Sequence, residues 1–334
     1  MTFISQVLFS LSGSMVSIAI DQRLSMKDKT MLSPIAIAFT PNYIVPAAVM
    51  LKSLLGSSTG SFEVICLVTE EIPEDMQQKL IALGKGRLNF RYIPLKGRLE
   101  GVYTDPRYTE AASFRLLLPE LLHEYDSIVY IDCDVIVRQD IGQLYRKTDL
   151  GDNYLGVVFE APIERQADRF KALGCDPNRY FNSGFLLMNL RQMREEKVSG
   201  KLLEACRVPY LEFPDQDALN QVCMGRVLPL SPLYNGIRTF FLPQYKADFC
   251  KVYPADMWEK VQKEATIHYT GGKPWSIFSI KFGEWWKVFY SLPKEIRGLM
   301  IFSPKVKLLA TLYRMGLGGV IDFAINSYRR IGHR

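Results

Sequence analysis

Apolar runs alternate with helix-like segments through the first third of the chain, and this order limits the possible folds more than any other feature. Residues 34–40, 62–69 and 88–94 are predicted to be buried strands, and residues 44–55 and 73–83 are predicted to be helices. Strands that alternate with helices in this way form a parallel sheet covered by the helices. We therefore expect an α/β protein whose N-terminal half is a nucleotide-binding unit of the Rossmann type.

The segments that follow predict a mixed sheet within the same domain. Residues 96–112 are predicted to be a polar loop, residues 114–122 a short helix and residues 127–131 another apolar strand. Later strands are expected at residues 154–159, 184–190 and 227–230, and later helices at residues 163–173, 191–206 and from 215 onward. No internal repeat or low-complexity tract divides residues 31–290. We therefore expect one continuous domain over that range.

Residues 1–30 are expected to be a disordered extension or the product of a start codon assigned too early. The first 20 residues carry no charged side chain, so they lack the basic start of a secretory signal. Their several serines make them too polar for a typical membrane span. A segment that touches a membrane is the alternative.

The cysteine pattern indicates a cytoplasmic protein. The six cysteines are scattered and form no Cys-x-x-Cys pair, and several lie in apolar runs such as residues 64–68. This is typical of reduced, mostly buried thiols rather than of a disulfide framework.

The net charge is concentrated in a basic tail, residues 291–334. The tail contains eight Lys and Arg against two acidic residues, so it carries the whole formal charge of +6. A nucleic-acid-binding protein would carry its basic residues across the fold, so no nucleic-acid partner is expected. Leu308, Leu309, Leu312 and Met315 follow helical spacing, which predicts short amphipathic helices that bind an anionic membrane surface. The alternative is that this face packs on the preceding domain.

The strongest signal for chemistry is Asp132-Cys133-Asp134, directly after the strand predicted at 127–131. Residues i and i+2 of an extended segment point to the same side, so the two carboxylates can converge. Two facing carboxylates repel each other, and the pair therefore favours a divalent cation that could bridge to a diphosphate. A purely structural turn is the alternative. A phosphatase-like Asp-x-Asp loop is disfavoured, because residues 135–137 are apolar instead of small and hydroxylic.

A second segment begins at His268, one of only three histidines, and continues through Gly271 to Lys273. A neutral imidazole is a good ligand for a transition metal that carboxylates already hold. Glycine backbone and a lysine can approach phosphate oxygens. A capped surface turn would produce the same pattern without a ligand.

Two further segments place polar residues at the start of an element. Asp215 and Gln216 open a helix, where a capping role alone would also explain them. Asn182 and Gly184 lie in an abrupt polar turn before an apolar strand, which would direct the Asn182 amide toward a ligand. An ordinary turn into a core strand is the alternative.

Together and in this order, the four motifs make the chain resemble glycosyltransferase family 8. That family includes bacterial lipopolysaccharide galactosyl- and glucosyltransferases and glycogenin, and the motifs cover most of residues 33–290. The resemblance implies a GT-A fold, a UDP-sugar donor, Mn²⁺ with Mg²⁺ as the alternative, and retention of the anomeric configuration.

The resemblance also implies roles for individual residues. The metal ligands are Asp132, Asp134 and His268. The donor-binding residues are Tyr43 beside the uracil, Arg115, Asp132, Cys133, Asn182, Gly184, Gly271 and Lys273. The catalytic residues are Asp215 and Gln216, with Gln216 on the reacting face of the sugar. Where the family usually has an acidic residue that contacts uracil, this chain has Thr40, so other groups must recognise the base.

The expected function is therefore retaining transfer of galactose or glucose from a UDP-sugar to a saccharide acceptor, in lipopolysaccharide or surface-polysaccharide synthesis. The expected location is the cytoplasmic face of the inner membrane, where a lipid-linked acceptor would be in reach. A catalytically inactive sugar-nucleotide-binding partner protein is the alternative. A nucleotidyltransferase would need a basic, glycine-rich loop after the first strand, which residues 40–43 do not supply.

Overall fold

The computed structural model describes residues 32–322 apart from residues 104, 106, 108 and 210. The extension predicted over residues 1–30 and the end of the basic tail, residues 323–334, therefore lie outside the described residues.

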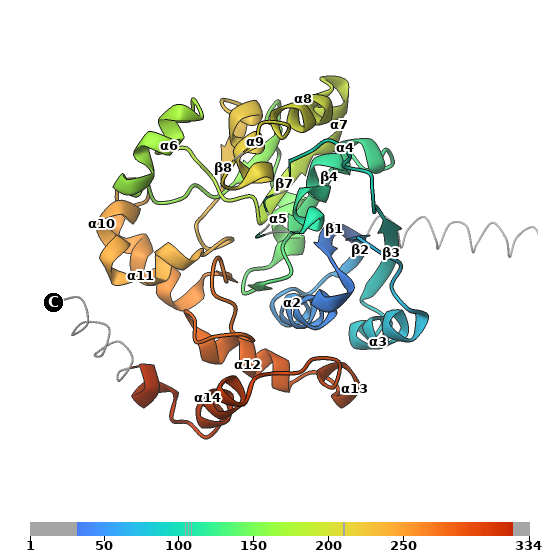
Figure 1. Ribbon diagram of the computed structural model, residues 1–334, viewed down its shortest axis with the longest axis vertical. Coiled ribbons are helices and arrows are strands. Elements are labelled where there is room, and N and C mark those ends of the chain that lie inside the picture. Colours follow the sequence, from blue (N-terminus) through green and yellow to red (C-terminus); the bar gives the residue numbers. More distant parts are fainter. Residues whose placement is uncertain (1–31, 104, 106, 108, 210, 323–334) are drawn as a thin grey trace, which may run out of the picture.

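A seven-stranded mixed sheet runs through the molecule in the order β3-β2-β1-β4-β7-β6-β8 (Figure 1). The strands are β1 (Leu32–Phe39), β2 (Ser61–Val68), β3 (Leu88–Pro94), β4 (Ser127–Ile131), β6 (Leu155–Val157), β7 (Phe185–Asn189) and β8 (Val227–Pro229). The first four strands in chain order are parallel, and β7 runs antiparallel to both of its neighbours. The α/β prediction with a Rossmann-like half and a mixed sheet is thus confirmed.

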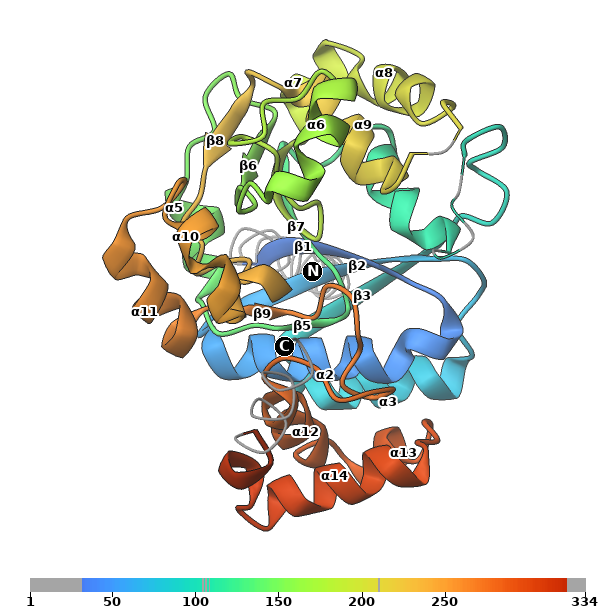
Figure 2. The same cartoon turned by 60° about the vertical axis from the view of Figure 1, so that its left-hand side comes forward.

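Helices cover both faces of this sheet (Figure 2). Helices α2 (Ile44–Ser57) and α3 (Glu74–Gly84) lie on one face, and η2 (Glu110–Leu117), α4 (Leu118–Leu121), α7 (Leu190–Glu195), α8 (Val198–Ala205) and α9 (Pro214–Cys223) lie on the other. Along β1, Ile35, Ile37 and Phe39 join the core beneath α2, whereas Ala36 joins the opposite core. Successive side chains of a strand point to opposite faces of the sheet, and here both faces are buried. The sequences of these strands are therefore continuous apolar runs instead of alternating ones.

A second, two-stranded sheet pairs β5 (Val135–Ile136) with β9 (Ile267–His268). The strands are antiparallel, and Val135 lies opposite His268. This pairing brings the segment after β4 beside a segment from the far end of the domain.

Predicted and observed helices differ in several places. The helix expected over residues 114–122 is a 3₁₀ segment, η2, that leads into the single turn of α4. The helix expected over residues 191–206 is divided into α7 and α8 at Lys197, whose φ is +54°. Helix α5 (Ile141–Lys147), which the Asp140 side chain caps, was not predicted.

The remaining elements connect the sheet to the C-terminal layer. They are η1 (Pro41–Tyr43), η3 (Glu164–Gln166), α6 (Ala167–Ala172), η4 (Arg238–Phe241), η5 (Pro243–Tyr245), α10 (Lys246–Phe249), α11 (Ala255–Glu264), α12 (Phe282–Tyr290), α13 (Lys294–Arg297) and α14 (Pro304–Arg314). All six cysteines lie in the described part of the chain, where none forms a disulfide and only Cys250 is exposed.

The start of the basic tail packs against α2 and α12, where Figure 2 shows α13 and α14 as a layer beneath α2. Ile296, Phe302, Val306 and Ala310 are buried in the same core as α2. Leu309 also faces this core, so it lies on the inner side of α14. Among the described helices, none is both long and apolar enough to cross a bilayer.

Candidate functional site

A cleft of about 540 Å³ opens beside the carboxyl ends of β1 and β4. This is the edge at which open α/β sheets bind their ligands. Apart from Gly184, the site residues predicted from the sequence all line this cleft: Tyr43, Arg115, Asp132, Cys133, Asp134, Asn182, Asp215, Gln216, His268, Gly271 and Lys273. Gly184 lies against His268 and Asp132. Segments far apart in the sequence therefore meet at one place.

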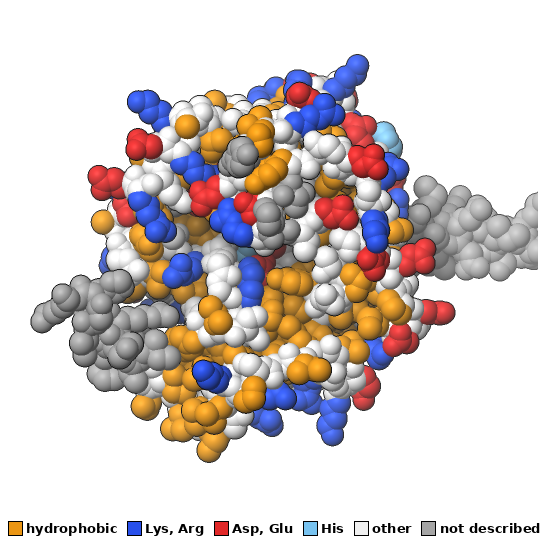
Figure 3. All heavy atoms as spheres, viewed as in Figure 1, with side chains coloured by type: hydrophobic (Ala, Val, Ile, Leu, Met, Phe, Trp, Pro, Cys, Tyr) orange, Lys and Arg blue, Asp and Glu red, His pale blue; other side chains and the backbone are white. Residues whose placement is uncertain are grey.

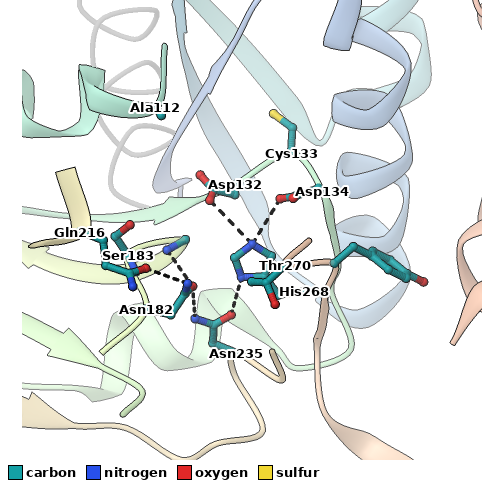
Figure 4. Close-up of polar contacts among 12 residues, drawn as sticks. Ala112, Asp132, Cys133, Asp134, Asn182, Ser183, Gln216, Asn235, His268 and Thr270 are labelled. Atoms are coloured by element: carbon teal, nitrogen blue, oxygen red, sulfur yellow. Dashed lines mark hydrogen bonds and ion pairs between the residues drawn. The ribbon is translucent and has the colours of Figure 1, made fainter. Parts of the chain in front are cut away.

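Asp132, Asp134 and His268 each bring one ligand atom to within 4.8 Å of the others. The Nε2 atom of His268 lies 3.3 Å from Oδ1 of Asp134 and 3.7 Å from Oδ2 of Asp132 (Figure 4). Backbone pairing is the local cause, because the two aspartates follow β4 and His268 pairs with Val135 across the β5–β9 ladder. Two carboxylates and a neutral imidazole form a ligand set for a divalent transition metal.

The glycine at position 184 keeps the space beside these three side chains clear. A Cβ atom there would lie 2.2 Å from Cε1 of His268 and 2.6 Å from Oδ2 of Asp132, which is far inside van der Waals contact. The Gly184 carbonyl also accepts a 2.8 Å hydrogen bond from the backbone N–H of Asp132. The close approach of this backbone requires glycine. The cleared space and the donor atoms together fit a divalent cation.

Two cations offset the carboxylates of the site. Arg115 donates from Nη2 to Oδ1 of Asp132 at 2.9 Å, and its Nε lies 3.2 Å from Oδ2 of Asp215. Lys273 pairs with Oδ2 of Asp134. Burial raises the pKa of Asp134, but the Lys273 ammonium group beside it outweighs burial and holds that pKa well below its usual range. Burial raises the pKa of Asp215 despite the nearby Arg115 guanidinium.

Tyr43 and Cys133 reach the cleft in different ways. The Tyr43 ring packs edge-on against Trp275, with 5.7 Å between the ring centroids. The Cys133 side chain points away from the His268 imidazole (Figure 4), and its Sγ lies 3.7 Å from the carbonyl oxygen of Ala38. The thiol is therefore outside the group of side chains that converge on the site.

The Gln216 amide is fixed by four hydrogen bonds. Its Oε1 accepts from Nδ2 of Asn182 at 2.9 Å and from the backbone N–H of Ser183 at 3.1 Å. Its Nε2 donates to the Tyr180 hydroxyl at 3.0 Å and to Oε1 of Glu160 at 3.2 Å. An amide has two donor hydrogens, and both are used here. The side chain is therefore held in one orientation.

Comparison with known proteins identifies the family. The sequence profile of glycosyl transferase family 8 matches residues 34–277, which is most of the described chain. The chain belongs to this family.

Its similarity to individual family members is moderate in identity and varies in extent. The chain is 25% identical to the lipopolysaccharide glucosyltransferase WaaO of Escherichia coli over 281 residues, which cover 81% of this chain and 80% of WaaO. It is 28% identical to general stress protein A of Bacillus subtilis over 176 residues, which cover 50% of this chain and 60% of that protein.

Solved structures confirm the GT-A fold expected for family 8. The galactosyltransferase LgtC, in complex with donor and acceptor sugar analogues, aligns with a TM-score of 0.65 and 27% identity. That alignment covers 80% of this chain and 100% of the LgtC chain. The bifunctional glycosyltransferase WbbM aligns with a TM-score of 0.69 and 22% identity over 81% of this chain and 52% of its own. The likeness to WbbM concerns the fold alone.

Two residues of this family 8 site were missed by sequence reasoning. Glu160 lines the cleft beside Gln216, and burial raises its pKa to about 7. Its place just after the strand predicted at 154–159 was an available signal, because ligands bind near strand ends. Asn235 is fully buried and bonds to both His268 and Asn182. An Asn-Gly pair usually marks a turn, so nothing in the sequence set Asn235 apart.

Proposed function

We propose that this family 8 protein is a retaining hexosyltransferase that transfers galactose or glucose from a UDP-sugar to a saccharide acceptor. The convergence of Asp132, Asp134 and His268 in one cleft with Lys273 carries the proposal. It offers a metal site and a phosphate-binding side chain to a sugar diphosphate. The names of WaaO and LgtC support sugar transfer, and that of WaaO supports a role in lipopolysaccharide or surface-polysaccharide synthesis.

Asp132, Asp134 and His268 would hold the cation of this site. Mn²⁺ suits these residues better than Mg²⁺, because an imidazole ligand favours a transition metal. A cation bound there would offset the negative charge of the donor diphosphate. Lys273 lines the same cleft, as does Gly271, whose φ of +96° is accessible to glycine. Both are suited to the remaining phosphate oxygens.

The other assigned residues surround the rest of the donor. We assign Tyr43 to the uracil side, Cys133 to a backbone contact, and Arg115, Asn182, Gly184 and Asp215 to the donor-sugar side. Arg115 would act mainly by holding the carboxylates of Asp132 and Asp215 in place, because it donates to one and contacts the other.

Retention follows if the acceptor attacks from the side on which the diphosphate leaves. The acceptor hydroxyl forms the new bond to the anomeric carbon as the bond to the phosphate oxygen breaks, and that oxygen takes the hydroxyl proton. Gln216 is a poor nucleophile, and its four hydrogen bonds make it a fixed dipole at the reacting face. A dipole that is already oriented stabilises developing charge without reorganisation.

UDP release from a panel of UDP-sugars in the presence of Mn²⁺ tests this function. We expect release from UDP-glucose or UDP-galactose, faster with an acceptor, and an α-linked product by NMR. Asp134→Asn should remove most turnover without unfolding the protein. Full activity in excess chelator would contradict the metal assignment. Tight binding of UDP-sugar without any release would instead identify an inactive partner protein.

The same proposal places the enzyme on the inner face of the cytoplasmic membrane, attached through the basic tail. Ile301, Leu308 and Met315 are 93%, 62% and 69% exposed. Apolar side chains gather at the lower edge of the molecule, over α14 (Figure 3). Lys305 and Lys307 are exposed on the same helix. Each basic residue near an anionic lipid surface contributes about 1 kcal/mol to binding. A lipid-linked saccharide acceptor fits this location.

A further inference from the structure

Asn235 lies between the two halves of the site. It is fully buried, and Figure 4 shows it between the His268 imidazole and the Asn182 amide. Its Oδ1 is 2.9 Å from Nδ1 of His268, and its Nδ2 donates to Oδ1 of Asn182 at 3.0 Å. Asn182 in turn donates to Gln216. One chain of hydrogen bonds therefore links the metal-ligand side to the donor-sugar side.

Backbone groups fix the direction of every bond in this chain. The backbone N–H of Ser183 donates to one end of the Gln216 amide at 3.1 Å, so that end is the oxygen, Oε1. Asn182 contacts the same oxygen and must therefore present its nitrogen, Nδ2, to Gln216. The N–H of Gly184 donates to the other end of the Asn182 amide at 3.0 Å, so that end is oxygen. A backbone N–H can only donate. The two observations agree, and they leave Asn235 as the donor to Asn182.

The orientation of Asn235 then determines the tautomer of His268. Because Asn235 presents its nitrogen to Asn182, it presents its oxygen to Nδ1 of His268. Nδ1 must therefore carry the hydrogen of the neutral ring. The lone pair is left on Nε2, which faces Asp134 and Asp132 at 3.3 and 3.7 Å. Partners of this kind fix the tautomer of metal-binding histidines.

We propose that Asn235 is a positioning residue that directs the Nε2 lone pair of His268 between Asp132 and Asp134 and couples it to Asn182. The proposal rests on the proposed function in one respect only, the assignment of Asp132, Asp134 and His268 as metal ligands. The position requires an acceptor at one end and a donor at the other, which asparagine supplies. Aspartate would keep the bond to His268 but oppose an oxygen to Oδ1 of Asn182. Alanine would remove both bonds.

Nitrogen-15 NMR of the histidines in the metal-free protein at alkaline pH tests the tautomer directly. The chain has only three histidines, so the His268 signals can be identified by their loss in His268→Gln. We expect wild-type His268 to carry its hydrogen on Nδ1. In Asn235→Ala we expect a shift toward the Nε2–H form, which a histidine side chain favours in water. Asn235→Asp should keep the Nδ1–H form.

Mn²⁺ affinity by titration calorimetry is the second measurement. Asn235→Ala should weaken Mn²⁺ binding roughly 10- to 100-fold, which is typical for the loss of such a partner. Asn235→Asp should retain Mn²⁺ affinity within a few-fold but lower kcat, because the link to Asn182 is broken. Asn220→Ala is the matched control, since Asn220 is also buried but bonds to the backbone of Phe181 and Gln216. It should leave the His268 signals unchanged.

An Nε2–H tautomer in the wild-type protein would overturn the proposal, and that measurement needs no variant to fold. Unchanged His268 signals and Mn²⁺ affinity in Asn235→Ala would do the same. If the tautomer is as expected but no UDP-sugar is turned over, the proposed function fails while the role of Asn235 in orienting His268 stands.

Discussion

At Gly184 the backbone passes so close to His268 and Asp132 that an added methyl group would overlap both side chains. We predict that Gly184→Ala displaces the His268 ring and lowers the rate of UDP release on the order of 100-fold, since a 1 Å misplacement has an effect of that size. Mn²⁺ binding should weaken in parallel, as measured by calorimetry.

Gly200 in α8 provides the matched control, because a Cβ atom there would meet nothing within 4 Å. Gly200→Ala should leave activity unchanged and raise the free energy of unfolding by about 0.5–1 kcal/mol, through better helix propensity. Equal activities of the two alanine variants would show that the space beside Gly184 is not needed.

Glu160 should give the protein a pH-dependent stability. Burial raises the pKa of this carboxyl to about 7 from an ordinary value of 4.5. The folded state therefore binds a proton more tightly than the unfolded state, and the stabilisation is full below pH 4.5 and lost as pH rises through 7. We predict that Glu160→Gln loses less stability than wild type between pH 5 and 8, by about 2–3 kcal/mol. Urea unfolding of both proteins at pH 5 and pH 8 measures the free energy of unfolding at each pH. An equal change in that free energy for wild type and Glu160→Gln would contradict the prediction.

At the residue scale, the sequence revealed the side chains that carry distinctive chemistry and missed those that orient them. Asp132, Asp134 and His268 are recognisable because their types and order are rare in combination. Asn235 and Glu160 are ordinary residues in ordinary positions. Their proposed roles depend on contacts with His268 and Gln216 that only the fold creates, and no local sequence pattern records such a contact.

At the element scale, Arg169 of α6 joins the first turn of α9 through Asp217, which is 0% exposed. Asp217 also accepts a 2.5 Å hydrogen bond from Tyr180, which holds Gln216. We predict that Arg169→Gln lowers the free energy of unfolding by about 3 kcal/mol, because it leaves a buried carboxylate without its cation. Urea denaturation measures this change.

A double variant separates charge from packing in the same pair. Asp217→Asn in the Arg169→Gln background should recover part of the loss, because no buried charge remains. Lys260→Gln is the matched control, as Lys260 pairs with Asp256 at 3.0 Å on the surface, with both side chains more than half exposed. Such a pair contributes less than about 1 kcal/mol. If Arg169→Gln lowered the free energy of unfolding no more than Lys260→Gln does, the proposed role of Arg169 in neutralising the buried Asp217 carboxylate would be contradicted.

The elements that the sequence predicted well are those with long apolar runs. The strand expected at 88–94 and the strand expected at 127–131 have the bounds of β3 and β4. Strands β5 and β9 have two residues each, too few to show a period, and they are held by pairing with each other and, for β9, with Gly236. The break at Lys197 is likewise invisible locally, since lysine does not usually adopt a positive φ.

At the scale of the whole molecule, we predict that the exposed side chains of the basic tail attach the protein to anionic vesicles. A triple variant, Ile301→Ser, Leu308→Ser and Met315→Ser, removes apolar side chains that contribute little to the core, because all three are exposed. It should sediment with phosphatidylglycerol vesicles at least 10-fold less than wild type, given the apolar area removed. High salt should also weaken the binding of the wild-type protein to these vesicles, because it screens the basic side chains of the tail.

Ile81→Ser on α3 is the control, because Ile81 is also exposed, at 43%, but is not part of the basic tail. It should sediment like wild type. Equal sedimentation of the triple variant and wild type would show that the tail only packs against α2 and α12. Truncation after Tyr290 would be a poorer test, since it also removes Ile296 and Val306 from the core.

The pairing of β5 with β9 has a consequence for how the protein is made. Lys273 and Asp134 are in contact although they are 139 residues apart along the chain. A ribosome delivers the β1–β4 half first, and that half has local strand–helix contacts with which to begin folding. The ion site cannot close until β9 has emerged, so a chain interrupted before His268 would hold the two aspartates without their third ligand. Under the proposed function, a cation can therefore be bound by all three residues only after β9 has been synthesised.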